Sequence, residues 1–123
     1  MRRKEALAEL IAKMEAGGNP SQAEWAEVFP DTPNDDDYPR SMMATQANVG
    51  WLDAAKALHE AVLPGWWWDV GIYADTEPMH EAYLTRHSEH GEAIDAIQAK
   101  APTPARAWLL AILRALHATE ADT

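Results

Sequence analysis

The 123-residue sequence contains no cysteine, and this absence excludes several kinds of site. Disulfide bridges, cysteine-ligated zinc, iron–sulfur clusters and cysteine nucleophiles all require a thiol. Long apolar runs are also missing, since no stretch approaches the roughly 18 residues of a membrane span. No signal peptide is apparent. We therefore expect a cytoplasmic protein that makes no contact with membranes.

Basic residues are scarce, because ten Lys and Arg stand against twenty Asp and Glu, a formal net charge of −10. Residues 21–40 and residues 64–100 each carry a net charge of −5. A field of this sign repels nucleic-acid phosphates and anionic membranes, so we expect no direct binding of nucleic acid. It attracts a basic protein surface. Solubility of a small Trp-rich domain is the simpler explanation of the same charge.

Hydrophobic residues make up 47% of the chain and include six Trp, enough for one buried core. The length predicts a single domain over residues 1–123. Within it we distinguish a helical N-terminal segment (residues 1–29), an acidic proline-rich loop (residues 30–41) and a core region (residues 51–118).

The spacing of apolar residues predicts three helices. Apolar side chains recur every three or four positions in residues 2–16, 51–63 and 104–118. The last of these segments also has a defined start, because Thr103 is a favourable N-cap and Pro104 suits the first helical position.

A fourth, shorter helix is predicted from its cap. Ser21 and Glu24 have the spacing of a capping box, which predicts a short helix through Val28 that buries Trp25. Residues 41–50 show no clear pattern.

Alternation of apolar and polar residues predicts a sheet in the second half of the chain. Residues 66–74 alternate with period two and are expected to form its central strand. Residues 79–86 are predicted as a second strand, and residues 92–100 fit either a third strand or a short helix. The order of elements predicts an α+β fold, a small antiparallel sheet of two to three strands packed with three to four helices in a layered sandwich.

The run Trp66-Trp67-Trp68 opens the first strand. Because side chains alternate along a strand, Trp67 lies on the opposite face from its two neighbours. We expect Trp66 and Trp68 in the core. Trp67 then either is covered by a further layer of helices or is exposed as a contact residue, a role in which Trp is enriched.

Two motifs carry a resemblance to a known family. The first comprises Leu52–Ala55 and Leu63–Trp66, and the second comprises Pro102–Ala107 and Leu109–Ala115. Together they cover about residues 51–118 and resemble the opening and closing motifs of the small phage ABA-sandwich domain family. The resemblance implies a protein encoded by a phage or prophage, with a layered α/β architecture. It implies no activity and no catalytic residues.

Potential metal ligands lack a fixed arrangement. His80, His87 and His90 lie close in sequence with glutamates nearby, but the last two fall in a predicted turn, so we predict no metal site. Asp35–Asp37 lack the alternate spacing and central glycine of a calcium loop. His59 is expected to pack at the edge of its helix.

No motif for catalysis is found. A glycine-rich phosphate loop, a nucleophile elbow and the nuclease and kinase motifs are all missing. Asp69 lies inside a predicted strand, either in a cleft walled by Trp67 and Tyr73 or on the solvated face of the sheet. A single carboxylate is in neither case the pair that acid–base catalysis requires. We predict no catalytic residues, no cofactor and no enzymatic activity.

The sequence favours a phage or prophage accessory protein that acts in the cytoplasm of the host bacterial cell. We expect it to bind a host protein with a basic surface and to inhibit a bacterial defence system, in the manner of an anti-CRISPR protein. The candidate partner-binding residues are Glu24, Glu27, Asp35, Asp36, Asp37, Trp67, Asp69 and Tyr73.

Two other functions stay open. A virion structural or assembly protein is one. The other is a ligand-binding protein that sequesters a nucleotide signal. Such a protein would need a pocket that holds two or more of Arg40, Lys56, Arg86, Lys100 and Arg106.

Overall fold

The computed structural model describes residues 3–30, 39–74 and 78–120, and it has an α+β fold. Helices and a three-stranded antiparallel sheet make up this part of the chain. In chain order the elements are α1 (Arg3–Glu15), α2 (Gln22–Val28), α3 (Arg40–Asn48), α4 (Leu52–Val62), β1 (Trp67–Ala74), β2 (Pro78–His87), β3 (Ala93–Ala101) and α5 (Pro104–Thr119).

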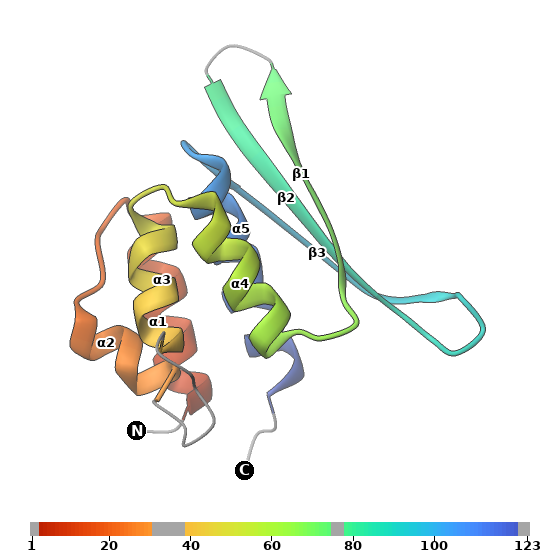
Figure 1. Cartoon of the computed structure of the whole chain (residues 1–123), viewed down its shortest axis with the longest axis horizontal. Coiled ribbons are helices and arrows are strands. Elements are labelled where there is room, and N and C mark those ends of the chain that lie inside the picture. The colour runs from red at the N-terminus through yellow and green to blue at the C-terminus, as the bar shows by residue number, and fades with distance from the viewer. Residues whose placement is uncertain (1–2, 31–38, 75–77, 121–123) are drawn as a thin grey trace.

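Helix α5 lies at the centre of the molecule. It packs on all three strands and also against α1, α3 and α4. Figure 1 shows the helices gathered on one side of the sheet, with the turn between β2 and β3 projecting away from them. The wide apolar stripe of α5 accounts for its position, since most of its residues are buried, among them Trp108, Leu109 and Ile112.

The predicted helices are confirmed, and a fifth helix is added. The capping box at the start of α2 is present, with the Ser21 hydroxyl accepting from the Glu24 N–H. Helix α3 occupies the segment that showed no clear pattern. It has no side-chain cap, and burial of Ala44 and Ala47 against its neighbours holds it instead. Within the described residues, no helix is long and apolar enough to cross a membrane.

The sheet has the strand order β1-β2-β3, so β2 is its central strand. The expectation that residues 66–74 form the central strand is wrong. Each strand pairs with the next one along the chain, so the second of the three strands, β2, lies in the middle of the sheet. The ambiguous residues 92–100 form a strand, β3, with a register shift opposite Arg86 and His87.

Small residues line the side of the sheet that faces α5. Ala82 on β2 is paired with Ala99 on β3, and both side chains are buried together with Leu84 and Ala101. Alanine methyl groups let the helix approach the sheet closely, so that the leucine and isoleucine side chains of α5 fill the space between the two layers.

Candidate interaction surface

The two faces of the sheet have different surroundings. Trp68 and Val70 of β1 point toward the helices, and by alternation Trp67 and Asp69 point to the other side. Among the described elements, none packs on that other side. We call it the open face. Trp67 has 65% of its surface exposed there, so of the two alternatives for this residue the structure has the exposed one.

Apolar side chains are unusually prominent on the open face. Tyr83 on β2 faces the same side as Trp67 and is 45% exposed. Ile94, the unpaired residue at the register shift of β3, is 55% exposed. Single exposed apolar residues are ordinary on a protein surface, but several on one uncovered sheet face mark a potential contact surface.

Carboxylates accompany these apolar side chains. Asp69 is paired with Tyr83 across β1 and β2, and its side chain is exposed. Glu81 also points to the open face but is buried, and the amide of Gln98 donates a 2.6 Å hydrogen bond to its carboxylate. Lys100 on β3 is paired with Glu81 and supplies a positive charge at the edge of the face.

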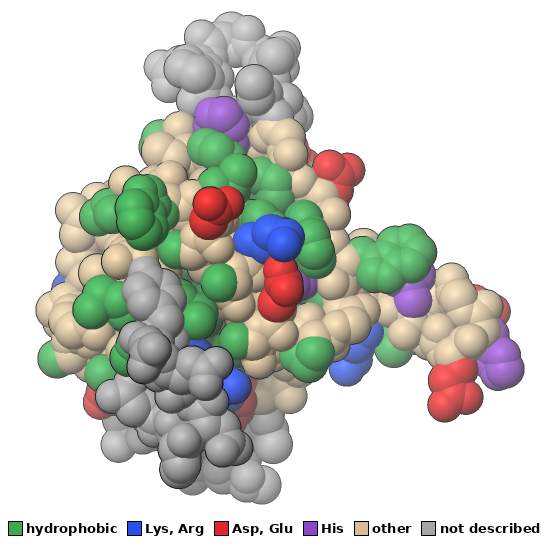
Figure 2. Space-filling model, in the orientation of Figure 1, with side chains coloured by type: hydrophobic (Ala, Val, Ile, Leu, Met, Phe, Trp, Pro, Cys, Tyr) green, Lys and Arg blue, Asp and Glu red, His purple; other side chains and the backbone are tan. Residues whose placement is uncertain are grey.

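The turn between β2 and β3 projects away from the helices. Figure 2 shows acidic and histidine side chains at its projecting end, where Glu89, His90 and Glu92 are exposed. The His87 ring lies 4.3 Å from the Trp67 ring, centroid to centroid, and so supports one side of the indole. In the described part of the chain, no three His, Asp or Glu side chains gather as a metal site.

The tryptophans beside Trp67 differ in burial. Trp66 is buried as expected, whereas Trp68 is 43% exposed, so the expectation that it lies in the core is wrong. Trp68 is on an edge strand, where Trp108 and His59 cover only part of its ring, at centroid distances of 5.4 and 5.1 Å. The ammonium of Lys56 lies 5.9 Å from the ring on its outer side.

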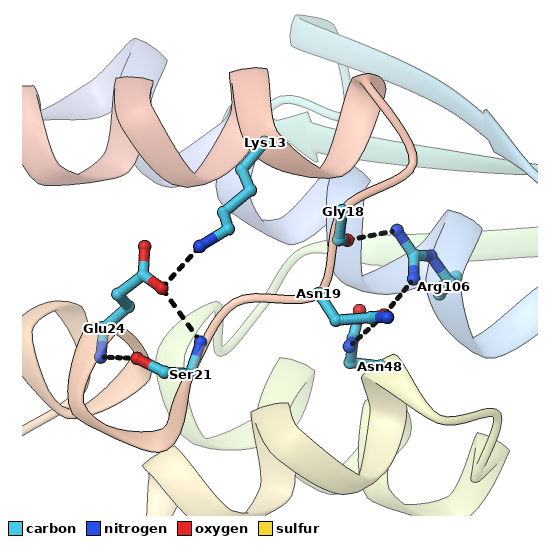
Figure 3. Close-up of polar contacts among 7 residues, drawn as sticks. All are labelled: Lys13, Gly18, Asn19, Ser21, Glu24, Asn48 and Arg106. Carbon is cyan, nitrogen blue, oxygen red and sulfur yellow. Dashed lines mark hydrogen bonds and ion pairs between the residues drawn. The ribbon is translucent and has the colours of Figure 1, made fainter.

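The candidate residues from the N-terminal half lie elsewhere. Helix α2, which carries Glu24 and Glu27, packs against α1 and α3 and makes no contact with the sheet. The Glu24 carboxylate accepts 2.7 and 3.0 Å hydrogen bonds from Lys13 and from the Ser21 N–H, and these bonds lower its pKa (Figure 3). Glu24 thus has a structural role at the start of α2, while Glu27 is exposed.

The side chains of the four remaining candidates are not among those that the structure describes. Asp35, Asp36 and Asp37 lie outside the described residues. Tyr73 belongs to β1, paired with Met79, but its side chain is not among those described. The open face therefore brings together Trp67 and Asp69 from the predicted set.

An exposed apolar cluster was not predicted from the sequence. Val49, Trp51 and Leu52 are exposed where α3 meets α4, and Met42 is exposed near the start of α3.

A cleft lies between the end of α1, β3 and α5. Its lining includes Lys100 and Arg106, two of the five cationic residues named above for a ligand-binding protein. The position of the cleft depends on the packing of separate segments, for which no local sequence signal exists.

Known protein families, characterised proteins and solved structures provide no match to this chain. Its function therefore has to be inferred from its own surface.

Proposed function

We propose that the protein acts without catalysis, by binding a host protein with a basic surface through the open face of its sheet. The observation that carries this proposal is the exposure of Trp67 on a sheet face that no described element covers. The role we propose for this binding is that of a phage or prophage accessory protein that inhibits a bacterial defence system. The motifs within residues 51–118 that resemble the phage ABA-sandwich family support the phage source alone, and the inhibition of a defence system rests on the acidic charge and the exposed Trp67.

Trp67 is well placed to anchor a partner. A strand restricts its backbone and the His87 ring supports the indole, so docking costs little conformational entropy. Burial of a large apolar side chain contributes roughly 1.5–3 kcal/mol. Tyr83 extends the apolar contact on the same face.

The charge of the chain specifies the kind of partner. Asp69 on the open face, with Glu89 and Glu92 at the projecting turn, favours a surface of Lys and Arg. The formal net charge of −10 adds long-range attraction that speeds encounter with a basic protein. A nucleic-acid-binding subunit of a defence complex has such a surface.

A capture experiment with matched variants tests the proposal. Wild-type protein, Trp67→Ala and Trp51→Ala are used as bait in extract of a bacterial host, and bound proteins are quantified by mass spectrometry. Trp51 is the control, because its exposed fraction of 62% is close to that of Trp67 but it lies where α3 meets α4.

We expect a basic host protein that is retained by wild type and Trp51→Ala and lost by Trp67→Ala. Equal retention by all three baits would show that the open face is not the binding surface.

A further inference from the structure

The cleft between α1, β3 and α5 has a local charge opposite to that of the whole chain. Its volume is about 790 Å³, within the range of small-molecule sites. Two arginines of α5, Arg106 and Arg114, line it, and Lys100 of β3 lies at its rim, with its side chain alternating toward the open face like that of its strand partner Glu81. Among the described residues of its lining, Glu15 is the one carboxylate. A concentration of positive charge in a chain of net charge −10 is a feature that a ligand would explain.

Arg106 is held rigidly at one end of the cleft. Its guanidinium donates to the Asn19 side-chain oxygen at 3.0 Å, to the Gly18 carbonyl at 3.1 Å and to the Met14 carbonyl at 3.4 Å. Figure 3 shows the contacts with Asn19 and Gly18, which fix the group beside the end of α1. Within the described residues these bonds use three of its five N–H donors, which leaves donors for an anion.

Arg114 is held at the other end. It donates a 2.6 Å hydrogen bond to the carbonyl of Gln98 at the edge of β3. Its second terminal nitrogen lies 3.5 Å from the Glu15 carboxylate. Because protein oxygens already position both guanidinium groups, an anion that binds between them does not have to order them.

We propose that this cleft binds a small organic phosphate. The guanidinium groups of Arg106 and Arg114 match the geometry of phosphate oxygens. Leu110, Ala101 and Pro102 give the cleft an apolar wall, which suits the organic part of such a molecule. The site is separate from Trp67 and does not depend on the proposed binding of a host protein.

Isothermal titration calorimetry tests whether the cleft binds an organic phosphate. The titrations are done at about 50 mM salt, because surface charge is only partly screened at this concentration. The probes are glycerol 3-phosphate and AMP, each compared with its dephosphorylated form, glycerol or adenosine. We expect saturable 1:1 binding of at least one phosphate and none of the uncharged forms. No saturable binding at about 1 mM, or equal binding of inorganic phosphate, would overturn the proposal.

Three single-residue variants locate the site. Arg114→Gln should weaken binding roughly tenfold, the loss expected from removing one charge-assisted contact. Lys56→Gln makes the same charge change on α4, where Lys56 pairs with Glu60 at 2.9 Å, and should leave binding unchanged. Glu15→Gln should tighten binding several-fold, because it removes the carboxylate that competes for Arg114. Equal weakening by Arg114→Gln and Lys56→Gln, or no tightening with Glu15→Gln, would contradict the proposed site.

Discussion

Acid should destabilise this protein through one buried histidine. His59 on α4 is 1% exposed, and its ring makes two hydrogen bonds. The Trp108 indole N–H donates to His59 Nδ1 at 3.1 Å. Because an indole N–H only donates, Nδ1 must be unprotonated, and Nε2 then donates to the Trp66 carbonyl at 3.0 Å. A second proton on the ring would break the bond to Trp108.

The direction of the effect follows from the pKa. Burial lowers the pKa of His59 below its ordinary value of 6.5, against a smaller opposing effect of the bond to Trp66. Between the lowered folded-state pKa and 6.5, the unfolded chain binds more protons at this position than the folded chain does. The free energy of unfolding therefore falls as the pH drops through this window, by up to about 1.4 kcal/mol per pH unit.

Urea unfolding followed by tryptophan fluorescence at a series of pH values from about 5 to 7.5 measures this slope. His59→Gln provides the key comparison, because its amide can donate to Trp66 and accept from Trp108 without titrating. We expect this variant to lose about 1–3 kcal/mol near neutral pH and to lose most of the slope. His90→Gln, at an exposed position in the β2–β3 turn, should keep the wild-type slope. An undiminished slope in His59→Gln would refute the reasoning.

Three further outcomes are expected in unfolding experiments. Trp67→Ala should cost less than about 1 kcal/mol of stability, whereas Trp25→Ala, at a fully buried position, should cost about 3–5 kcal/mol by urea unfolding. Ala99→Leu should cost about 1–3 kcal/mol by overpacking the space under α5, and Ala96→Leu on the open face should change stability by less than about 0.5 kcal/mol. Ser21→Ala removes the cap of α2 and should cost about 1 kcal/mol, seen as a lower Tm by circular dichroism. Equal losses of stability in Trp67→Ala and Trp25→Ala, or in Ala99→Leu and Ala96→Leu, would contradict the burial assigned to these residues.

Helices with local signals were predictable from the sequence. Two helix starts were predicted from neighbouring residues, the capping box of Ser21 and Glu24 and the N-cap Thr103 followed by Pro104. In both cases the interacting residues are at most three positions apart, so the sequence shows the interaction directly. Helix α3 was not predictable, because packing of Ala44 and Ala47 against other helices stabilises it and no cap or stripe marks it.

The sheet was predictable only in part. Alternation indicated β1 and β2, but strand order depends on how the hairpins connect, which alternation does not encode. Ile94 and Ile97 are three apart, as on a helix, and the register shift at Ile94 interrupts the period-two pattern that would indicate a strand.

The sequence left two alternatives for Trp67, burial under a further layer of helices or exposure as a contact residue, and it did not decide between them. Alternation separated Trp67 from Trp66 and Trp68, but which face the helices cover is a tertiary property. The position of the cleft between α1, β3 and α5 is likewise a tertiary property, because Glu15, Lys100 and Arg114 come from three separate elements.

The central claim is that a host protein binds through the open face of the sheet. The affinity of the Trp67→Ala variant for a captured host protein tests this claim most directly. Purified wild type, Trp67→Ala and Trp51→Ala are titrated with that host protein by calorimetry. We expect Trp67→Ala to weaken the Kd at least roughly thirtyfold, the loss of a hot-spot residue, while Trp51→Ala stays within about twofold of wild type. A Kd for Trp67→Ala equal to that of wild type would contradict binding through the open face.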